Sequence, residues 1–342
     1  FSDLPVVDIS PFLGGSGSSR AETAEALDRA CREVGFFYLE GHGVPEEDVT
    51  HLHRVARSFF ALPEDAKGAV AIGKRPSGGR GYQRLGENVT LGRRDWHEAL
   101  DFYAERKAPS VDLGALCRPP GCLDSEQAEQ VKLFVEGENM WPASPPELRP
   151  VAERHFAQMS RVGGALMEAM GLALGLPSTH FKSLTDRSFW CARIIGYPPL
   201  PDTEPGLSVG EHTDYGCWTI LAQDDTPGAL EVQRSDGSWI SVDPRPGAFV
   251  INLGDMLSVW TEGRYLATPH RVRQTRSAYR TSVAYFHEPN FDAIIEPLGL
   301  GKDSRRVMRG STEPLGRALE GGALVYGEHL FAKVSSNFDF GE

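Results

Sequence analysis

Two histidines and one aspartate have the types and spacing of a transition-metal site. One residue separates His212 from Asp214, and His270 follows much later in the chain. Residues i and i+2 of a strand point to the same face, so a strand here would present the first two side chains together. Two imidazoles and one carboxylate on one face of Fe(II) leave coordination positions open for substrate and O2. We therefore predict that His212, Asp214 and His270 bind iron and form the catalytic centre.

The surrounding sequence strengthens a pattern that is weak by itself. A His-x-Asp spacing occurs by chance in many proteins, and a buried histidine beside a surface aspartate is the alternative. Here the motif precedes an apolar run at 218–221, His270 closes a second run, and a third follows at 283–286. The His-x-Asp motif, His270 and the Arg-x-Ser motif are therefore associated with three predicted strands, as the mouth of a β-barrel requires.

Arg280 and Ser282 stand at alternate positions of the third predicted strand, so their side chains face the same way. A guanidinium fork beside a hydroxyl group suits a carboxylate ligand. The alternative is an ordinary arginine ion pair on a barrel strand.

The composition is acidic and otherwise ordinary. Of 342 residues, 40% are hydrophobic and 24% are charged, and the formal net charge is −12. This length holds one large domain or two. A general binder of nucleic acid or of an anionic membrane is expected to carry the opposite charge. We therefore expect a small-molecule substrate and no nucleic-acid or membrane partner. The oligomeric state stays open.

The cysteines indicate a reducing compartment. Their number is odd and their spacing forms no paired pattern: Cys31, Cys117, Cys122, Cys191 and Cys217. No second pair accompanies Cys117 and Cys122 to complete a zinc site. The sequence also shows no signal segment and no apolar stretch of the length that spans a membrane. We expect a cytoplasmic protein with free thiols.

Helical patterns dominate the first half of the chain. Ser19 and Glu22 form a capping box that starts an amphipathic helix, and Pro45 starts a second one. A long helix is expected from about 146 to 173, interrupted or bent near Gly163 and Gly164. The Gly/Arg-rich segment 73–86 is expected to form a loop over the site.

The second half of the chain is rich in short β-type runs separated by turns. These runs cover residues 190–197, 217–223, 229–232, 239–242, 249–253 and 281–286. Short strands at this spacing favour a sandwich or jelly roll over a parallel βαβ sheet.

Nearly the whole chain resembles the isopenicillin N synthase-like group of Fe(II)/2-oxoglutarate-dependent oxygenases. The resemblance rests on LPVVD at 4–8, on FFYLEGHG at 36–43, on RIIGYPP at 193–199 and on the His-x-Asp…His…Arg-x-Ser series. The segments YFHEPNF at 285–291 and YGEH at 326–329 are most similar to bacterial members, including the ethylene-forming enzyme.

The resemblance implies an α+β fold, a distorted double-stranded β-helix (jelly roll) braced by N-terminal and central helices. It divides one compact unit into three regions. A mainly helical region with the first strands spans 1–180, the oxygenase core spans 181–295, and a C-terminal extension near the active site spans 296–342.

The resemblance also implies the chemistry. Fe(II), the co-substrate 2-oxoglutarate and O2 would hydroxylate an unactivated C–H bond of a small molecule, with release of succinate and CO2. A natural-product intermediate or an amino acid derivative is the expected substrate. Arg280 and Ser282 would hold the distal carboxylate of 2-oxoglutarate with help from Tyr197. The chain departs from the plant-type pattern at Ile195, where those members carry asparagine.

Four residues are candidate substrate contacts. Arg193 shares a predicted strand face with Tyr197. It is expected to clamp a substrate carboxylate or to support a residue that does, and the alternative is a structural ion pair. Glu98 lies in a segment that lines the substrate site in relatives, and its alternative is a solvated carboxylate. Tyr82 and Asn88, from the Gly-rich segment and its surroundings, are candidates of the same kind.

Other functions remain open at this level. An iron oxidase or oxidative cyclase that does not use 2-oxoglutarate would keep the same motifs, and stoichiometric succinate release would distinguish it. Desaturation or ethylene formation would need only a different fate of the same substrate radical. A jelly-roll binding protein without catalysis is the alternative from another class, although the intact motifs argue against it.

Overall fold

The computed structural model describes residues 3–15, 18–74, 78–90, 92–106, 125–200, 207–265, 267–273, 278–300 and 322–337. Its strands are β1 (Val6–Asp8), β2 (Phe36–Glu40), β3 (Gly81–Gln83), β4 (Val89–Thr90), β5 (Arg93–Arg94), β6 (Glu98–Tyr103), β7 (Cys191–Tyr197), β8 (Leu207–His212), β9 (Trp218–Gln223), β10 (Leu230–Gln233), β11 (Trp239–Ser241), β12 (Phe249–Leu253), β13 (His270–Arg273), β14 (Arg280–His287), β15 (Ile294–Ile295) and β16 (Leu324–Val325). Its helices are η1 (Ser10–Phe12), α1 (Arg20–Glu33), α2 (Glu46–Phe60), α3 (Glu64–Gly68), α4 (Ser125–Glu136), α5 (Leu148–Ala173), α6 (Lys182–Thr185), α7 (Asp255–Trp260) and α9 (Tyr326–Asn337).

Two sheets pack against each other and form the core that positions the site. The larger has eight strands in the order β1-β2-β12-β9-β14-β7-β6-β3, and the smaller has the order β11-β10-β13-β8. Ala99, Ile195 and Tyr197 of the larger sheet pack with Val209 and Val272 of the smaller one. We call the surface of the larger sheet that faces the smaller sheet its inner face. This α+β jelly roll confirms the expected fold class.

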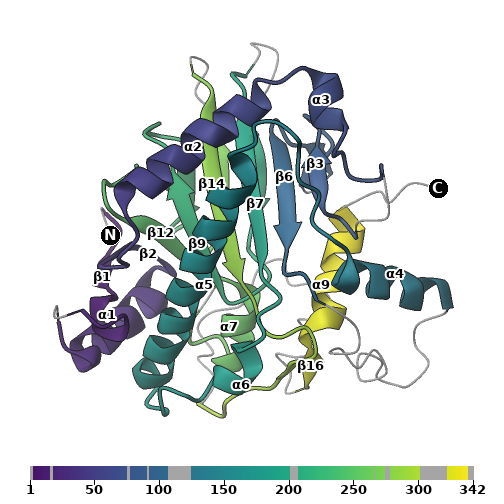
Figure 1. The fold of residues 1–342 in the computed structure, drawn as a ribbon. Coiled ribbons are helices and arrows are strands. Elements are labelled where there is room, and N and C mark those ends of the chain that lie inside the picture. Colours follow the sequence, from purple (N-terminus) through teal and green to yellow (C-terminus); the bar gives the residue numbers. More distant parts are fainter. Residues whose placement is uncertain are drawn as a thin grey trace.

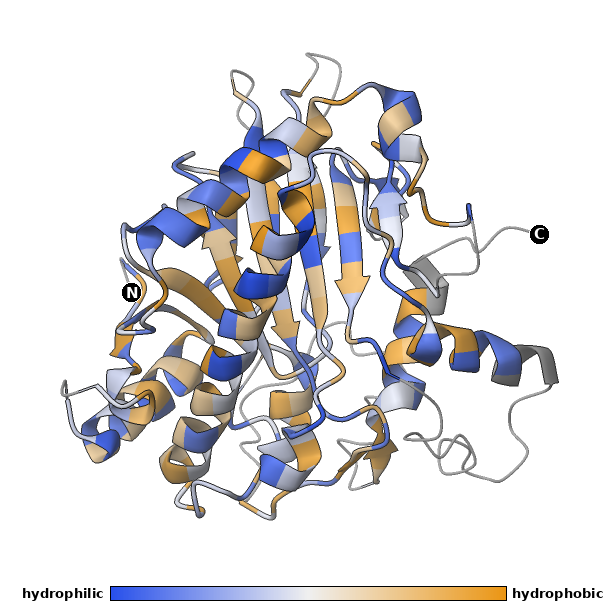
Figure 2. Ribbon diagram, in the orientation of Figure 1, coloured by the Kyte–Doolittle hydropathy of each residue, from blue (hydrophilic) through white to orange (hydrophobic). Residues whose placement is uncertain are grey.

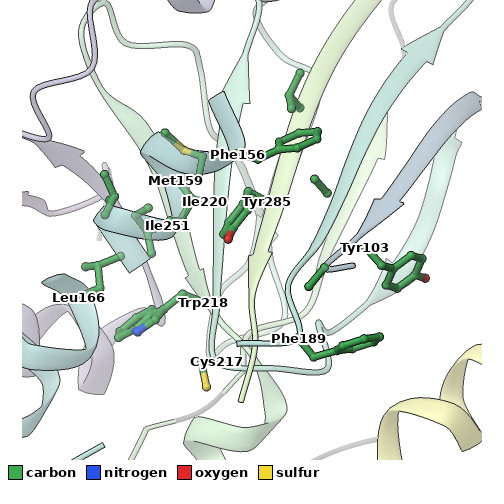
Figure 3. Packing of buried hydrophobic residues seen from close by; sticks show 14 of the residues in the cluster. Tyr103, Phe156, Met159, Leu166, Phe189, Cys217, Trp218, Ile220, Ile251 and Tyr285 are labelled. Atoms are coloured by element: carbon green, nitrogen blue, oxygen red, sulfur yellow. The ribbon is translucent and has the colours of Figure 1, made fainter. Parts of the chain in front are cut away.

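Helices cover the other surface of the larger sheet, which we call its helical face. Figure 1 shows α2 and α5 crossing the strands of this sheet. In Figure 3, Phe156 and Met159 of α5 point toward Ile220 and Tyr285 on the strands, and all four are buried. Figure 2 shows helices of this layer banded hydrophilic and hydrophobic, as expected for helices with one face against a sheet.

Local signals set the helix boundaries. Ser19 Oγ accepts a hydrogen bond from the Glu22 backbone N–H at 3.2 Å, and the Glu22 carboxylate accepts one from the Ser19 N–H at 2.6 Å. This capping box starts α1 as predicted. The second predicted helix is confirmed as α2, with Pro45 at its N-cap.

Two local expectations change. Helix α5 runs continuously through Gly163 and Gly164, so the helix is not interrupted there. Gly163 instead permits close packing, because a Cβ there would lie 2.4 Å from Nδ1 of His287 on β14. Part of the segment 73–86, expected as a loop, forms strand β3 at the edge of the larger sheet. Among the described residues, no helix has the length and apolar character needed to cross a membrane.

Candidate active site

The three predicted metal ligands converge at the edge of the smaller sheet. His212 is the last residue of β8 and lies directly opposite His270, the first residue of β13. Their rings are 4.3 Å apart between centroids. The Nε2 atoms of His212 and His270 each lie 3.8 Å from a carboxylate oxygen of Asp214. One ligand atom from each residue falls within 4.8 Å of the others, so the group could hold a metal ion.

Asp214 and His270 reach the site by a backbone path that differs from the predicted one. Asp214 lies beyond the end of β8, in the loop that leads to β9, so strand alternation does not pair it with His212. His270 begins its strand and does not close one. The backbone N–H of Asp255, at the start of α7, donates to the Asp214 carbonyl at 2.8 Å and so helps to fix this loop.

Hydrogen bonds orient each ligand toward the common point. Nδ1 of His212 lies 2.8 Å from the Gly210 carbonyl, and Nδ1 of His270 lies 3.1 Å from the Thr268 carbonyl. A carbonyl can only accept, so Nδ1 carries the proton in both rings and Nε2 keeps its lone pair for a metal.

The Asp214 carboxylate is held by two donors on the inner face. Its Oδ2 atom accepts from the hydroxyl of Thr219 and, at 2.7 Å, from the side-chain amide of Asn252. Burial alone would raise the pKa of Asp214, but the neighbouring imidazoles and these two donors outweigh it and lower the pKa. Burial and the adjacent His212 lower the pKa of His270 to about 4. At neutral pH, Asp214 is therefore ionised and His270 is neutral, as metal binding requires.

Arg280 is a buried cation that forms no ion pair with a carboxylate among the described residues, where Asp224 is a nearby charge. Its side chain is 1% exposed and lies over the ring of Tyr197, with Cζ 4.7 Å from the ring centroid. Nη2 donates to the amide oxygen of Gln223 at 3.1 Å, whereas Nε and Nη1 are buried and have no hydrogen-bond partner in the described part of the chain. Leaving a buried charge in this state is costly, so the position fits an anionic ligand.

The other predicted members of this group lie beside Arg280. Tyr197 is its direct neighbour across the strands, and the Ser282 hydroxyl donates to the Tyr197 hydroxyl at 3.3 Å. Ile195 lies on the same face within an apolar cluster and offers no polar contact. The sequence analysis missed Gln223, which supplies the amide group beside Arg280. Its place at the end of a predicted strand that begins near Asp214 was the available signal.

Arg193 lies on the inner face and is already paired. Its Nε and Nη2 donate to the two carboxylate oxygens of Asp101 at 2.8 Å each, and Nη2 also donates to Gln83 at 2.8 Å. The structural ion pair, one of the two alternatives, is therefore formed. One fifth of the side chain, 20%, remains exposed.

The structure places Glu98 and Tyr82 on the helical face of the larger sheet and not on the inner face beside Arg280. Glu98 lies opposite Gly196, and its alternation along β6 points it to the helical face. Its carboxylate accepts from Lys67 Nζ and from the Tyr82 hydroxyl, both at 2.6 Å. Side chains alternate between the two faces along β6, so Ala99 points to the inner face and its neighbour Glu98 does not.

Asn88 also has a structural partner. Its side-chain amide donates to Asp95, whose other carboxylate oxygen accepts from the Gly210 backbone N–H at 3.1 Å. Because the carbonyl of Gly210 orients His212, Asn88 supports strand β8 through Asp95.

Comparisons with known proteins agree with this geometry. The chain matches the family model "non-haem dioxygenase in morphine synthesis N-terminal" over residues 4–144 and the model "2OG-Fe(II) oxygenase superfamily" over residues 187–289. It is similar to a homoarginine-6-hydroxylase of Arabidopsis thaliana, with 39% identity over 99% of this chain and 98% of that protein. It is 32% identical to validamycin A dioxygenase of Streptomyces hygroscopicus subsp. limoneus, covering 86% of this chain and 79% of that protein.

Solved structures show the same fold. A 2OG-Fe(II) oxygenase family protein of Caulobacter crescentus superposes with a TM-score of 0.75 at 24% identity, covering 98% of this chain and 99% of that chain. JOX2, in complex with 2OG, Fe and JA, superposes with a TM-score of 0.69 at 27% identity, covering 87% and 78%.

Sequence identity across the full length and a His-Asp-His group of suitable geometry lead to one conclusion. The chain belongs to the 2OG-Fe(II) oxygenase superfamily and is a non-haem dioxygenase that uses Fe(II), 2-oxoglutarate and O2 to hydroxylate a small molecule.

Proposed function

We propose that His212, Asp214 and His270 hold the iron and that Arg280, with Ser282 and Tyr197, takes the distal carboxylate of 2-oxoglutarate. The buried guanidinium of Arg280 carries this proposal, because two of its nitrogens have no partner among the described residues. A bidentate carboxylate would satisfy such a fork. When bound, the iron and its co-substrate supply the oxidant that breaks a C–H bond, and the protein side chains position the reactants and exclude water.

We further propose that the substrate is homoarginine or a closely related amino acid with a basic side chain. Four proteins named homoarginine-6-hydroxylase are 36–39% identical to this chain over 98–99% of its length. Arg193 is the candidate contact for the carboxylate of such a substrate. Among the described residues its Nη1 makes no hydrogen bond, and the pair with Asp101 fixes the rest of the guanidinium.

The test is a coupled assay with purified enzyme, Fe(II), 2-oxoglutarate and O2. Homoarginine is expected to give one succinate for each product that has gained one oxygen atom, with arginine, lysine and validamycin A as competing substrates. Product without succinate would contradict the co-substrate assignment. Succinate release that no basic amino acid stimulates would contradict the substrate assignment. Arg193→Met should raise the KM for homoarginine about 10-fold if Arg193 binds its carboxylate.

We also propose how the chain is divided into regions and in which compartment the protein works. The regions 1–180 and 181–295 are proposed as parts of one unit, supported by the strands of both regions in a single sheet. Cys31, Cys191 and Cys217 are free thiols, which supports a reducing cytoplasmic compartment. The small-molecule substrate and the acidic charge favour no nucleic-acid or membrane partner. The expected extension 296–342 lies partly outside the described residues. Cys117 and Cys122 lie outside them entirely.

A further inference from the structure

One hydrogen bond on the helical face spans three strands. The hydroxyl of Tyr279, the residue before β14, donates to Oε1 of Glu98 on β6 at 2.9 Å. Strand β7 lies between β6 and β14 in the sheet. The bond therefore passes over β7 and connects two strands that are not neighbours.

Gly196 of β7 stands at the crossing point. It lies opposite Glu98 on one side and Thr281 on the other. A Cβ added at Gly196 would lie 2.0 Å from the Tyr279 hydroxyl oxygen and 2.9 Å from Cδ2 of Phe60. Any residue with a side chain at this position would displace Tyr279, so the glycine is required by space and not by backbone conformation.

The acceptor end of this bond is fixed by other buried groups. Lys67 of α3 and Tyr82 of β3 donate to Glu98 Oε2. Lys67 is 7% exposed, Tyr82 1% and Glu98 6%. Burial, together with the Glu98 carboxylate, raises the pKa of Tyr82 and of Tyr279, so both hydroxyls remain hydrogen-bond donors. A satisfied, buried network of this kind is rigid.

The residues that follow Tyr279 and Gly196 point to the inner face. Arg280 follows Tyr279, Tyr197 follows Gly196, and these two lie directly opposite each other. Successive residues of a strand alternate between faces, so fixing the first member of each pair fixes the direction of the second.

We propose that Glu98, Tyr279 and Gly196 position Arg280 and Tyr197 for the carboxylate of 2-oxoglutarate, acting through the sheet from the opposite face. They are positioning residues and do not touch the ligand. This inference rests on the proposed function, in which Arg280 binds that carboxylate.

Tyr279→Phe and Tyr82→Phe are a matched pair for the test. Each removes one tyrosine hydroxyl from Glu98, but only Tyr279 reaches β14. The readout is the Kd of 2-oxoglutarate for the Mn(II)-loaded protein, measured by anaerobic calorimetry, with melting temperatures recorded in parallel. Tyr279→Phe should weaken 2-oxoglutarate binding up to about 10-fold, as expected if the loss of one buried hydrogen bond is passed on to Arg280. Tyr82→Phe should change the Kd less than about twofold. Equal Kd values for the two variants would overturn the proposal.

Gly196→Ala and the double variant Gly196→Ala/Tyr279→Phe test the crossing directly. The alanine should weaken 2-oxoglutarate binding more than Tyr279→Phe does, and removing the clashing hydroxyl in the double variant should restore part of the loss. Strictly additive losses would contradict the proposed contact.

Arg280→Met distinguishes the binding role of Arg280 from the positioning role of Tyr279. Unchanged 2-oxoglutarate binding in Arg280→Met would refute the proposed function itself. Weak binding in Arg280→Met with wild-type binding in Tyr279→Phe would refute only the positioning role.

Discussion

Two buried cations, Lys67 on the helical face of the larger sheet and Arg280 on its inner face, have contrasting partners. On the helical face, Lys67 is paired with Glu98 at 2.6 Å, and the carboxylate is completed by two tyrosine hydroxyls. On the inner face, Arg280 is equally buried, yet two of its nitrogens have no partner among the described residues. The contrast separates a cation whose partners belong to the fold from a cation that, in our proposal, binds a ligand.

The comparison predicts that substitutions at the proposed metal and 2-oxoglutarate positions remove function at little cost in stability. The largest expected effect is that of His212→Ala, which should lose iron and at least about 1,000-fold in activity, since only two protein ligands would remain. The melting temperature of the metal-free protein should change little, because the His212 side chain is 32% exposed. Metal analysis after dialysis is the measurement. The exposed His180→Ala is the control and should retain iron; iron loss in both variants would refute the assignment.

On the helical face, Lys67→Met should act in the opposite sense. It leaves the buried carboxylate of Glu98 without its cation, so the free energy of unfolding should fall by about 3–5 kcal/mol. Urea unfolding measures this change. Lys132→Met is the matched control, because its pair with Glu129 is exposed and long at 3.9 Å, and it should cost less than about 0.5 kcal/mol. Similar costs for the two variants would break the comparison.

The helical face also carries buried neutral histidines, which predict sensitivity to acid. Burial lowers the pKa of His155 to about 3 and that of His287 to about 4, from an ordinary value of 6.5. Above pH 6.5 neither the folded nor the unfolded state is protonated. Below it only the unfolded state takes up the proton, so stability falls as the pH drops from 6.5 toward 4. Each histidine should account for about 1 kcal/mol between pH 7 and 5.5. His155→Leu should flatten the measured loss by that amount, and an unchanged pH profile would contradict the account.

Tyr197→Phe should give the smallest effect. The phenyl ring under Arg280 remains, and only the hydroxyl that accepts from Ser282 is lost. The KM for 2-oxoglutarate should rise about fivefold, equivalent to roughly 1 kcal/mol for one hydrogen bond. Tyr265→Phe, which alters a buried tyrosine bonded to Asp28, serves as the control. A larger effect in the control would show that hydroxyl loss acts through the fold and not through the ligand.

Much of the fold and the centre of the site could be predicted from the sequence. Strands such as β12 and β14 follow from short apolar runs between turn residues, and α1 follows from its capping box. The motif around His212, Asp214 and His270 contains its own chemistry, so its members could be identified without their coordinates. The same holds for Arg280 and Ser282, which share a strand face by simple alternation.

Cross-strand partners could not be predicted. The sequence places Glu98 near the site, but one residue of register decides between the inner and the helical face. Arg193 finds Asp101 and Gln83 on strands more than 90 residues earlier in the chain, and nothing in the local pattern indicates that pairing. Asp214 reaches the site through a loop whose path is fixed by α7, a tertiary contact that strand periodicity does not contain.

The central claim is that the buried guanidinium of Arg280, in which two nitrogens have no hydrogen-bond partner among the described residues, binds the distal carboxylate of 2-oxoglutarate. Anaerobic calorimetric titration of 2-oxoglutarate into the Mn(II)-loaded wild-type protein and into Arg280→Met tests it most directly. The wild type should bind one equivalent, and Arg280→Met should bind about 100-fold more weakly, as expected for loss of a bidentate charged contact. Its metal-free form should be about as stable as the wild type, because the buried charge that is removed has two nitrogens without a hydrogen-bond partner among the described residues. Equal affinity of the two proteins for 2-oxoglutarate would contradict the account.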